Sequence, residues 1–196
     1  MQFTDLPIHH NLLKALEIKG LDTPTEIQSK AIPYGLMGKD LIASSKTGSG
    51  KTLAFLLPAV HRVLTKQPLS RRDPRVLILA PTRELAKQVF LQLKGLIAKQ
   101  QLKAALILGG ENFNDQVKAL KHHPQFIVGT AGRVADHLAG KSLFLNGLEM
   151  LILDEADRML DLGFASQLRL INQAADHRKR QSMMFSATLD LPLIHI

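Results

Sequence analysis

Residues 45–52, Ser-Lys-Thr-Gly-Ser-Gly-Lys-Thr, lie between a predicted strand and a predicted helix. Gly48 and Gly50 let backbone N–H groups close around phosphate oxygens, and the first turn of the following helix adds its positive dipole end. Lys51 can reach terminal phosphates, and the Thr52 hydroxyl suits Mg²⁺. The pattern G-x-x-x-x-G-K-[ST] is missed only at its first position, where Ser45 replaces glycine. A glycine-rich turn used only for tight packing is the alternative, but the flanking strand and helix favour a phosphate loop.

Carboxylates follow a second apolar run. Residues 150–153 are continuously hydrophobic and lead into Asp154-Glu155-Ala156-Asp157. A strand there would bring the carboxylates to its C-terminal end, where open α/β sheets bind ligands. Asp154 would then hold Mg²⁺ through a water molecule, and Glu155 would orient or deprotonate the water that attacks a terminal phosphate. An N-cap or a solvated turn is the alternative for an isolated acidic run.

Short apolar runs alternate with helical patterns, which indicates an α/β fold with a mostly parallel sheet and helices on both faces. The predicted strands are continuously apolar, as strands buried on two faces are. They span Leu41–Ala43, Val76–Ala80, Ala104–Leu108, Phe126–Val128, Met150–Leu153 and Met183–Phe185. The predicted helices span Leu53–Leu64, Glu84–Ala98, Phe113–Leu120, Arg133–Leu138 and Gly163–Ala174. Residues 70–74 break both periods and predict an exposed loop.

The composition bounds the class of protein. A chain of 196 residues with 45% hydrophobic content can bury one sizeable core, so we expect one domain. Its 25 Lys and Arg against 17 Asp and Glu give a formal charge of +8, which favours polyanions as partners, although an ordinary basic surface would carry the same charge. The absence of cysteine excludes disulfides, thiolate catalysis and cysteine-ligated zinc, and fits a cytoplasmic protein. No apolar run approaches the roughly 18 residues of a membrane span, so we expect no membrane association.

Residues 154–157 and the phosphate loop together resemble the DEAD-box helicases, and further motifs of that family occur in order. These are Phe3, at the position of the upstream aromatic; residues 20–28, the Q motif; residues 81–86, motif Ia; Gly109-Gly110, the glycine doublet; residues 130–133, motif Ib; and residues 186–188, Ser-Ala-Thr, motif III. The matches cover nearly the whole chain. The resemblance implies that residues 1–196 are the N-terminal RecA-like P-loop NTPase domain of an RNA helicase, with ATP and Mg²⁺ as cofactors and RNA as partner.

The resemblance also implies the residues of a nucleotide site. Gln28 has a side-chain amide that donates and accepts at once, which suits the edge of adenine. Phe3 would stack on the base, with an ordinary core aromatic as the alternative, and Thr25 would support the loop. The implied nucleotide-binding residues are Phe3, Thr25, Gln28, Ser45, Lys46, Thr47, Gly48, Ser49, Gly50, Lys51 and Thr52. The implied catalytic residues are Lys51, Asp154 and Glu155, and the implied Mg²⁺ ligands are Thr52 and Asp154.

An RNA track and a coupling element are implied as well. Hydroxyls, close-approach glycines and guanidinium groups suit phosphates and sugars rather than base edges. The implied RNA contacts are Thr82, Arg83, Gly110, Thr130, Gly132 and Arg133. A charge pair with Glu84 at the start of a helix is the alternative for Arg83. Ser186 and Thr188 follow a strand predicted beside the one before Asp154, so their hydroxyls could bond Asp157 and couple ATP turnover to RNA rearrangement; a strand-end turn is the alternative.

Two positions depart from the family pattern. Ala131 stands where proline is usual and Leu21 where an aromatic is usual, and the first change would loosen the motif Ib loop. Nothing after Thr188 resembles the second RecA-like domain of the family, which carries the arginine finger and further RNA-binding motifs. We therefore expect a monomeric half-motor. A P-loop kinase and an RNA-clamping module without turnover are the rival functions, and the ordered motifs argue against the first.

Overall fold

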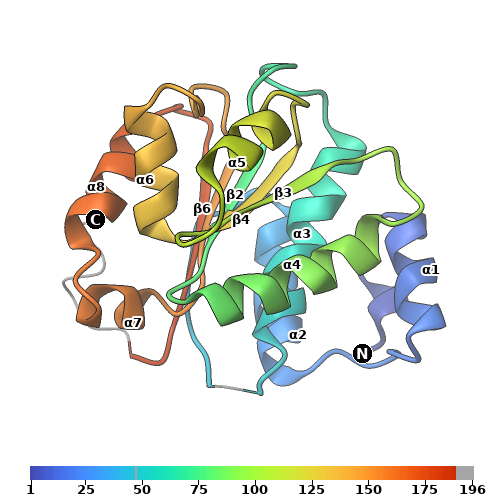
Figure 1. The fold of residues 1–196 in the computed structure, drawn as a ribbon. Coiled ribbons are helices and arrows are strands. Elements are labelled where there is room, and N and C mark those ends of the chain that lie inside the picture. Colours follow the sequence, from blue (N-terminus) through green and yellow to red (C-terminus); the bar gives the residue numbers. More distant parts are fainter. Residues whose placement is uncertain (47, 189–196) are drawn as a thin grey trace.

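A computed structural model describes residues 1–46 and 48–188 of the chain. Helices and strands alternate along it, as the sequence predicts (Figure 1). The strands are β1 (Leu41–Ser44), β2 (Val76–Leu79), β3 (Ala104–Ile107), β4 (Phe126–Gly129), β5 (Met150–Leu153) and β6 (Gln181–Ser186). The helices are a 3₁₀ turn η1 (Phe3–Asp5), α1 (His10–Ile18), α2 (Glu26–Leu36), α3 (Lys51–Thr65), α4 (Arg83–Ile97), α5 (Phe113–Leu120), α6 (Ala131–Ala139), α7 (Ala156–Asp161) and α8 (Ala165–Ala174). Among the described residues, no helix is long and apolar enough to cross a membrane.

The strands of the described region form one sheet in the order β1-β6-β5-β2-β4-β3. Every neighbouring pair is parallel, so the predicted architecture is confirmed and the sheet is parallel throughout rather than mostly. Parallel strands end at one edge of a sheet, which is the lower edge in Figure 1. Because β1 leads into the phosphate loop and β5 into Asp154, that edge brings the two chemical motifs together, as it does in other open α/β sheets.

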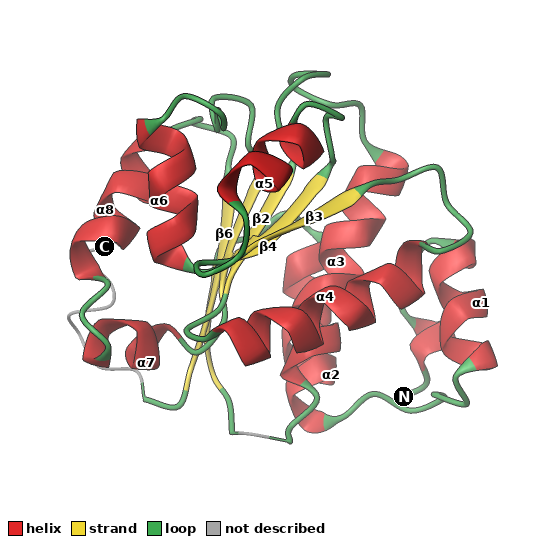
Figure 2. Ribbon diagram, viewed as in Figure 1, coloured by secondary structure: helices red, strands yellow, loops and turns green. Residues whose placement is uncertain are grey.

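Helices cover both faces of the sheet (Figure 2). In β2, Val76 and Ile78 belong to a hydrophobic cluster with residues of α1, α2, α3 and α4, whereas Leu77 and Leu79 belong to a cluster with residues of α5, α6, α7 and α8. All four β2 side chains are fully buried. Each such side chain stabilises the fold by about 1.5 to 3 kcal/mol relative to an exposed position. The continuous apolar runs of the sequence thus reflect a sheet covered on both sides.

Polar caps fix where several helices begin. Thr25 caps α2, Thr82 caps α4 and Asn112 caps α5, each by accepting a hydrogen bond from a backbone N–H of the first turn. A cap of this kind is worth about 1 kcal/mol. The caps at Thr25 and Thr82 lie within the Q motif and motif Ia, so residues predicted to bind ligands also set the ends of helices.

The structure contains elements that the sequence did not predict. Helices α1, α2 and α7 are absent from the prediction, and β6 starts at Gln181, two residues earlier than expected. Pro33 and Gly35 lie inside α2 and disguise its periodicity. Gln181 is buried because its Nε2 donates to the carbonyls of Gly35 and Lys39, at 3.0 and 2.9 Å. These hydrogen bonds to the end of α2 and to the segment after it explain why a polar side chain is buried in the sheet.

Candidate nucleotide and RNA site

The phosphate loop connects β1 to α3 at the C-terminal edge of the sheet. Gly48 and Gly50 have φ angles of 78° and 84°, in the left-handed region that glycine adopts without strain. Gly50 is the N-cap of α3, whose first-turn N–H groups have no intrahelical partners. Thr47 lies outside the described residues. A cavity of about 490 Å³ opens beside the loop, lined by Thr25, Glu26, Ile27, Lys30, Ser44, Ser45, Lys46, Gly48 and Ser49.

Gln28 and Thr25 tie α2 to the phosphate loop. Gln28 Oε1 accepts from the Thr25 N–H at 2.9 Å, and Thr25 Oγ1 accepts from the Gln28 N–H at 3.4 Å, which is a capping box. Gln28 Nε2 donates to the carbonyl of Gly50 at 2.9 Å. A Cβ on residue 50 would lie 2.6 Å from Nε2, so this approach requires glycine. The buried amide keeps one N–H and one oxygen lone pair for a ligand, and its contact with adenine stays a prediction.

Phe3 lies in the hydrophobic core and is 3% exposed. Its backbone N–H donates to the carbonyl of Asp22 at 2.9 Å, which fastens η1 to the segment before α2. Phe3 is not among the residues that line the cavity beside the phosphate loop. Phe3 is thus packed in the hydrophobic core, and its stacking on adenine stays a prediction.

Lys51, Asp154 and Glu155 meet at the C-terminal edge of the sheet. The Lys51 ammonium lies 2.9 Å from Asp154 Oδ1 and 3.3 Å from Glu155 Oε2. Asp154 is 2% exposed, and this burial raises the pKa of its carboxyl above the ordinary value, an effect that Lys51 partly offsets. Glu155 has a φ of 53°, which is uncommon for a non-glycine residue and is concentrated at functional sites. It occupies the N-cap position of α7 without making a capping hydrogen bond, so its carboxylate is directed to Lys51 instead.

Four buried side-chain oxygens of the described chain have no hydrogen-bond partner, and all belong to the predicted site: Ser45 Oγ, Ser49 Oγ, Asp154 Oδ1 and Ser186 Oγ. Asp154 Oδ1 is at ion-pair distance from Lys51 but accepts no hydrogen bond of good geometry. A buried polar atom without a partner costs about 1 to 3 kcal/mol, so a cluster of them indicates a place for a polar ligand.

These oxygens suit a Mg²⁺-nucleotide. Hard cations such as Mg²⁺ prefer oxygen donors and usually combine one or two protein groups with phosphate oxygens and water. Within residues 1–46 and 48–188, no group of three or more His, Asp or Glu residues could hold a metal by itself. A Mg²⁺ held by Thr52 and Asp154 would therefore need phosphate oxygens to complete its shell.

Motif III is bonded to the phosphate loop by backbone rather than side chain. Ser186 ends β6, which lies beside β5 as predicted and also pairs with β1. Its carbonyl accepts from the Ser45 N–H at 2.8 Å. Its hydroxyl is fully buried without a partner, so the expected bond to Asp157 is not made, and Thr188 is exposed. The β1–β6 ladder thus links motif III to the first residue of the loop, and the coupling role of Asp157, Ser186 and Thr188 stays a prediction.

Parts of motif Ia, the glycine doublet and motif Ib converge on Glu111. Arg83 Nη2 lies 3.3 Å from Glu111 Oε1, Lys87 Nζ lies 4.0 Å from the same oxygen, and Arg133 Nη1 donates to the Glu111 carbonyl at 3.0 Å. Gly110 has a φ of 80°, and a Cβ there would lie 2.7 Å from Arg83 Nη1. The Arg83 side chain is 45% exposed, whereas that of Arg133 is 14% exposed. The Arg83 side chain is thus partly exposed, Arg133 is mainly engaged inside the protein, and the contact of either residue with RNA stays a prediction.

The remaining predicted RNA contacts lie at helix starts. Thr82 Oγ1 accepts from the N–H of Leu85 at 3.2 Å, so this hydroxyl already serves as a cap. Thr130 is the N-cap of α6, and Gly132 lies in its first turn. Ala131 is the first residue of α6 and is 1% exposed, and its effect on the motif Ib loop stays a prediction. A proline would fit this first helical position, but alanine continues the helix equally well.

Arg133 is surrounded by three residues that were not predicted from the sequence: Glu111, Gln116 and His137. His137 lies on the buried stripe of α6 with Ala131 and Val134. A titratable residue at the apolar spacing of a helix was therefore the available signal.

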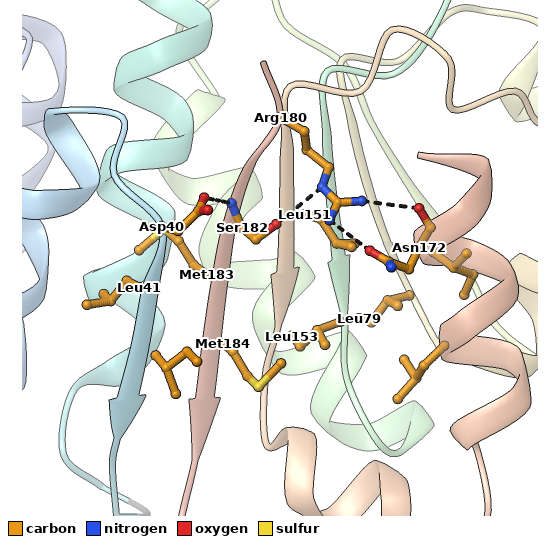
Figure 3. Close-up of a pocket in the computed structure, with 13 residues that line it drawn as sticks. Asp40, Leu41, Leu79, Leu151, Leu153, Asn172, Arg180, Ser182, Met183 and Met184 are labelled. Carbon is orange, nitrogen blue, oxygen red and sulfur yellow. Dashed lines mark hydrogen bonds between the residues drawn. The ribbon is translucent and has the colours of Figure 1, made fainter. Parts of the chain in front are cut away.

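A second cavity, of about 240 Å³, lies between α8 and the strands β1, β6 and β5 (Figure 3). Its lining is mainly apolar and includes Leu151 and Leu153. The polar groups at its rim bond one another: Arg180 Nε donates to Ser182 Oγ at 3.2 Å and Arg180 Nη2 to Asn172 Oδ1 at 2.8 Å. This cavity contains none of the predicted site residues, and we assign it no function.

Comparison with known proteins agrees with this geometry. The family model described as DEAD/DEAH box helicase matches residues 25–194. The chain is 43% identical over 191 residues to the ATP-dependent RNA helicase RhlB of Pasteurella multocida, covering 96% of this chain and 45% of that protein. It is 40% identical over 190 residues to the ATP-dependent RNA helicase RhlB of Actinobacillus succinogenes, covering 96% and 46%. The crystal structure of a DEAD box protein from the hyperthermophile Methanococcus jannaschii superposes with a TM-score of 0.89 at 37% identity, covering all of this chain and 52% of that one.

The chain thus spans about half the length of the curated relatives that it matches. The family model covers most of its residues, including the phosphate loop, the Asp-Glu-Ala-Asp run and motif III. The chain therefore belongs to the DEAD/DEAH box helicase family.

Proposed function

We propose that this chain is the ATP-binding half of an RNA helicase, which couples ATP binding and hydrolysis to RNA clamping and local duplex unwinding when joined to a second RecA-like domain. The observation that carries the proposal is the ion pairing of Lys51 with Asp154 and Glu155 at the start of α3, together with buried hydroxyls of Ser45, Ser49 and Ser186 that have no hydrogen-bond partner among the described residues. The two curated relatives are named ATP-dependent RNA helicases, which supports ATP as the nucleotide and RNA as the partner.

The nucleotide half of the proposal assigns a task to each side chain. The Lys51 ammonium, which contacts the carboxylates of Asp154 and Glu155, would bind the terminal phosphates when nucleotide is present. Thr52 and Asp154 would hold Mg²⁺, which neutralises phosphate charge when bound. Glu155 would orient the attacking water or accept its proton. Gln28 would offer its remaining N–H and lone pair to adenine.

The RNA half of the proposal rests on the surface around Glu111. Arg83 and Lys87 present half-exposed cationic groups beside the close-approach glycine Gly110. Such groups recognise phosphates and sugars without reading base sequence. The formal charge of +8 favours the same class of partner.

The chain alone would be a weak motor. A cross-cleft arginine finger contributes about 10³ to 10⁵ in rate to phosphoryl transfer, and we assign none within this chain. We therefore propose that residues 1–196 act as a cytoplasmic monomer that binds adenine nucleotide, hydrolyses it very slowly and unwinds no duplex. A covalently joined second domain would raise the rate and make it depend on RNA.

The test compares phosphate release from ATP, with and without single-stranded RNA, by this chain and by a two-domain version carrying the second half of a relative. RNA-stimulated release by the two-domain protein is expected, with loss on Lys51→Ala and no change on Lys14→Ala, an exposed lysine of α1. Strong RNA-stimulated release by residues 1–196 alone would overturn the half-motor. Nucleotide binding without any release in the two-domain protein would favour a clamping module instead.

A further inference from the structure

A buried polar chain ties α5 and α6 to the loop after β3. Gln116 of α5 is 6% exposed and its Nε2 donates to the carbonyl of Leu108 at 2.8 Å. Its Oε1 accepts from Arg133 Nη1 at 3.1 Å and lies 2.8 Å from His137 Nε2. Leu108 directly precedes Gly109 and Gly110, so Gln116 joins the glycine doublet to the arginine of motif Ib.

The partners of Gln116 fix its orientation. A guanidinium only donates and a carbonyl only accepts, so Oε1 must face Arg133 and Nε2 must face Leu108. The contact between His137 Nε2 and that same Oε1 then requires a proton on Nε2. Every polar atom of the Gln116 amide is thereby directed, with both oxygen lone pairs in use.

The surroundings of His137 fit this tautomer. Ser142 Oγ lies 2.7 Å from Nδ1 and 3.2 Å from the His137 carbonyl, and its single hydrogen can be donated to Nδ1, the nearer of these two acceptors, when that nitrogen is unprotonated. Burial and the nearby Arg133 lower the pKa of His137, so its ring is neutral at neutral pH. The ring stacks on Phe113 with centroids 4.1 Å apart and an interplanar angle of 3°, and the Arg133 guanidinium carbon lies 5.5 Å from the Phe113 centroid.

We propose that Gln116 and His137 are positioning residues for RNA binding, which act through Arg133 on the glycine-doublet loop. His137 supplies one donor to Gln116, Gln116 holds Arg133, and Arg133 holds the carbonyl of Glu111 beside Gly110. Neither residue need contact RNA. The inference rests on the proposed RNA function of this surface. It holds that side chains of α5 and α6 fix the conformation of the loop that contains Gly109 and Gly110.

The test measures the affinity of the 196-residue chain for a fluorescent single-stranded RNA at low salt, and its affinity for ADP. Gln116→Ala should lower RNA affinity roughly three- to tenfold, the size of a typical coupling between contacting residues, and leave ADP affinity unchanged. In an Arg133→Ala background the same substitution should have little further effect, because its route is already removed. Gln92→Ala, at an exposed glutamine of α4, is the matched control.

Side-chain ¹⁵N shifts of His137 in the unmodified chain add a readout that does not depend on a variant folding. A neutral ring protonated at Nε2 is expected, and a neutral ring protonated at Nδ1 would overturn the proposal. Additive losses in the double variant would do the same, as would an equal fall in ADP affinity. Arg83→Ala tests the underlying function: if it leaves RNA affinity unchanged, the RNA surface itself is wrong. If Arg83→Ala weakens RNA binding and Gln116→Ala behaves like Gln92→Ala, only the positioning role fails.

Discussion

Replacing Lys51 by methionine should destabilise the nucleotide-free chain, because the buried Asp154 carboxylate would lose the cation that compensates its charge. Removing one partner of a buried ion pair costs about 3 to 5 kcal/mol. We expect about 3 kcal/mol, the lower end of that range, because Lys51 is 12% exposed and because Asp154 can escape part of the cost by taking up a proton. For a chain of this size, that corresponds to a fall in Tm of roughly 6 to 12 °C.

The pH dependence identifies the carboxyl responsible. Burial raises the pKa of Asp154 in the folded chain above its ordinary value of 3.8. At pH values above this raised pKa, the ionised carboxylate therefore lowers the stability of the folded chain. That cost disappears as the pH falls toward 3.8, because the folded chain then keeps its proton. Lys51→Met raises the same pKa further, so its loss of stability should be larger at pH 8 than at pH 5.

Thermal unfolding followed by circular dichroism, without nucleotide or metal, measures both effects. Adding Asp154→Asn should restore most of the stability lost in Lys51→Met, since the amide carries no charge to compensate. Lys14→Met, at an exposed position, controls for the loss of a lysine. Equal destabilisation at both pH values, or no rescue by Asp154→Asn, would refute the reasoning.

Other predictions concern the same site and the opposite end of the sheet. Gln28→Ala should reduce the preference for ADP over GDP by about 1 to 3 kcal/mol in parallel titrations, and equal affinities in the unmodified chain would sink the adenine role. Glu155→Gln in the two-domain protein should abolish phosphate release while ATP binding persists; a parallel loss of affinity would make Glu155 a binding residue. Glu149→Ala should lower stability by about 3 to 5 kcal/mol without changing ADP affinity. Glu149 is fully buried and accepts from Arg75 Nε at 2.7 Å and Arg62 Nε at 3.0 Å, so its removal leaves both guanidinium groups without their carboxylate partner. An unchanged Tm would contradict this prediction.

The sequence predicted the parts of the site that depend on local order along the chain. The apolar runs before Ser45 and Asp154 are strands of one parallel sheet, and the segments that leave parallel strands emerge at a shared edge. The contact between Lys51 and the two carboxylates is a consequence of that geometry. The capping box of α2 was not predicted, although Thr25 and Gln28 have its three-residue spacing.

Contacts between distant segments could not be predicted in the same way. No local pattern pairs Gln116 with His137 or places the Gln28 amide on the carbonyl of Gly50. The burial of Phe3 depends on how η1 packs under the rest of the chain, which periodicity does not encode. Likewise, Ser186 bonds Ser45 through its backbone, so its residue type gave no indication of that link.

The order of strands in the sheet has a consequence for synthesis on the ribosome. In the described sheet, β1 is an edge strand whose partner is β6, so Leu41 to Ser44 pair with residues made about 140 positions later. The strands β2 to β5 can assemble among themselves as the chain emerges, because domains fold progressively during synthesis. The strand that carries the phosphate loop must wait for residues 181–186 before it has a hydrogen-bonding neighbour. Nascent chains released before that point should therefore fold much of the sheet yet bind no nucleotide, and they would leave β1 as an unpaired edge open to association.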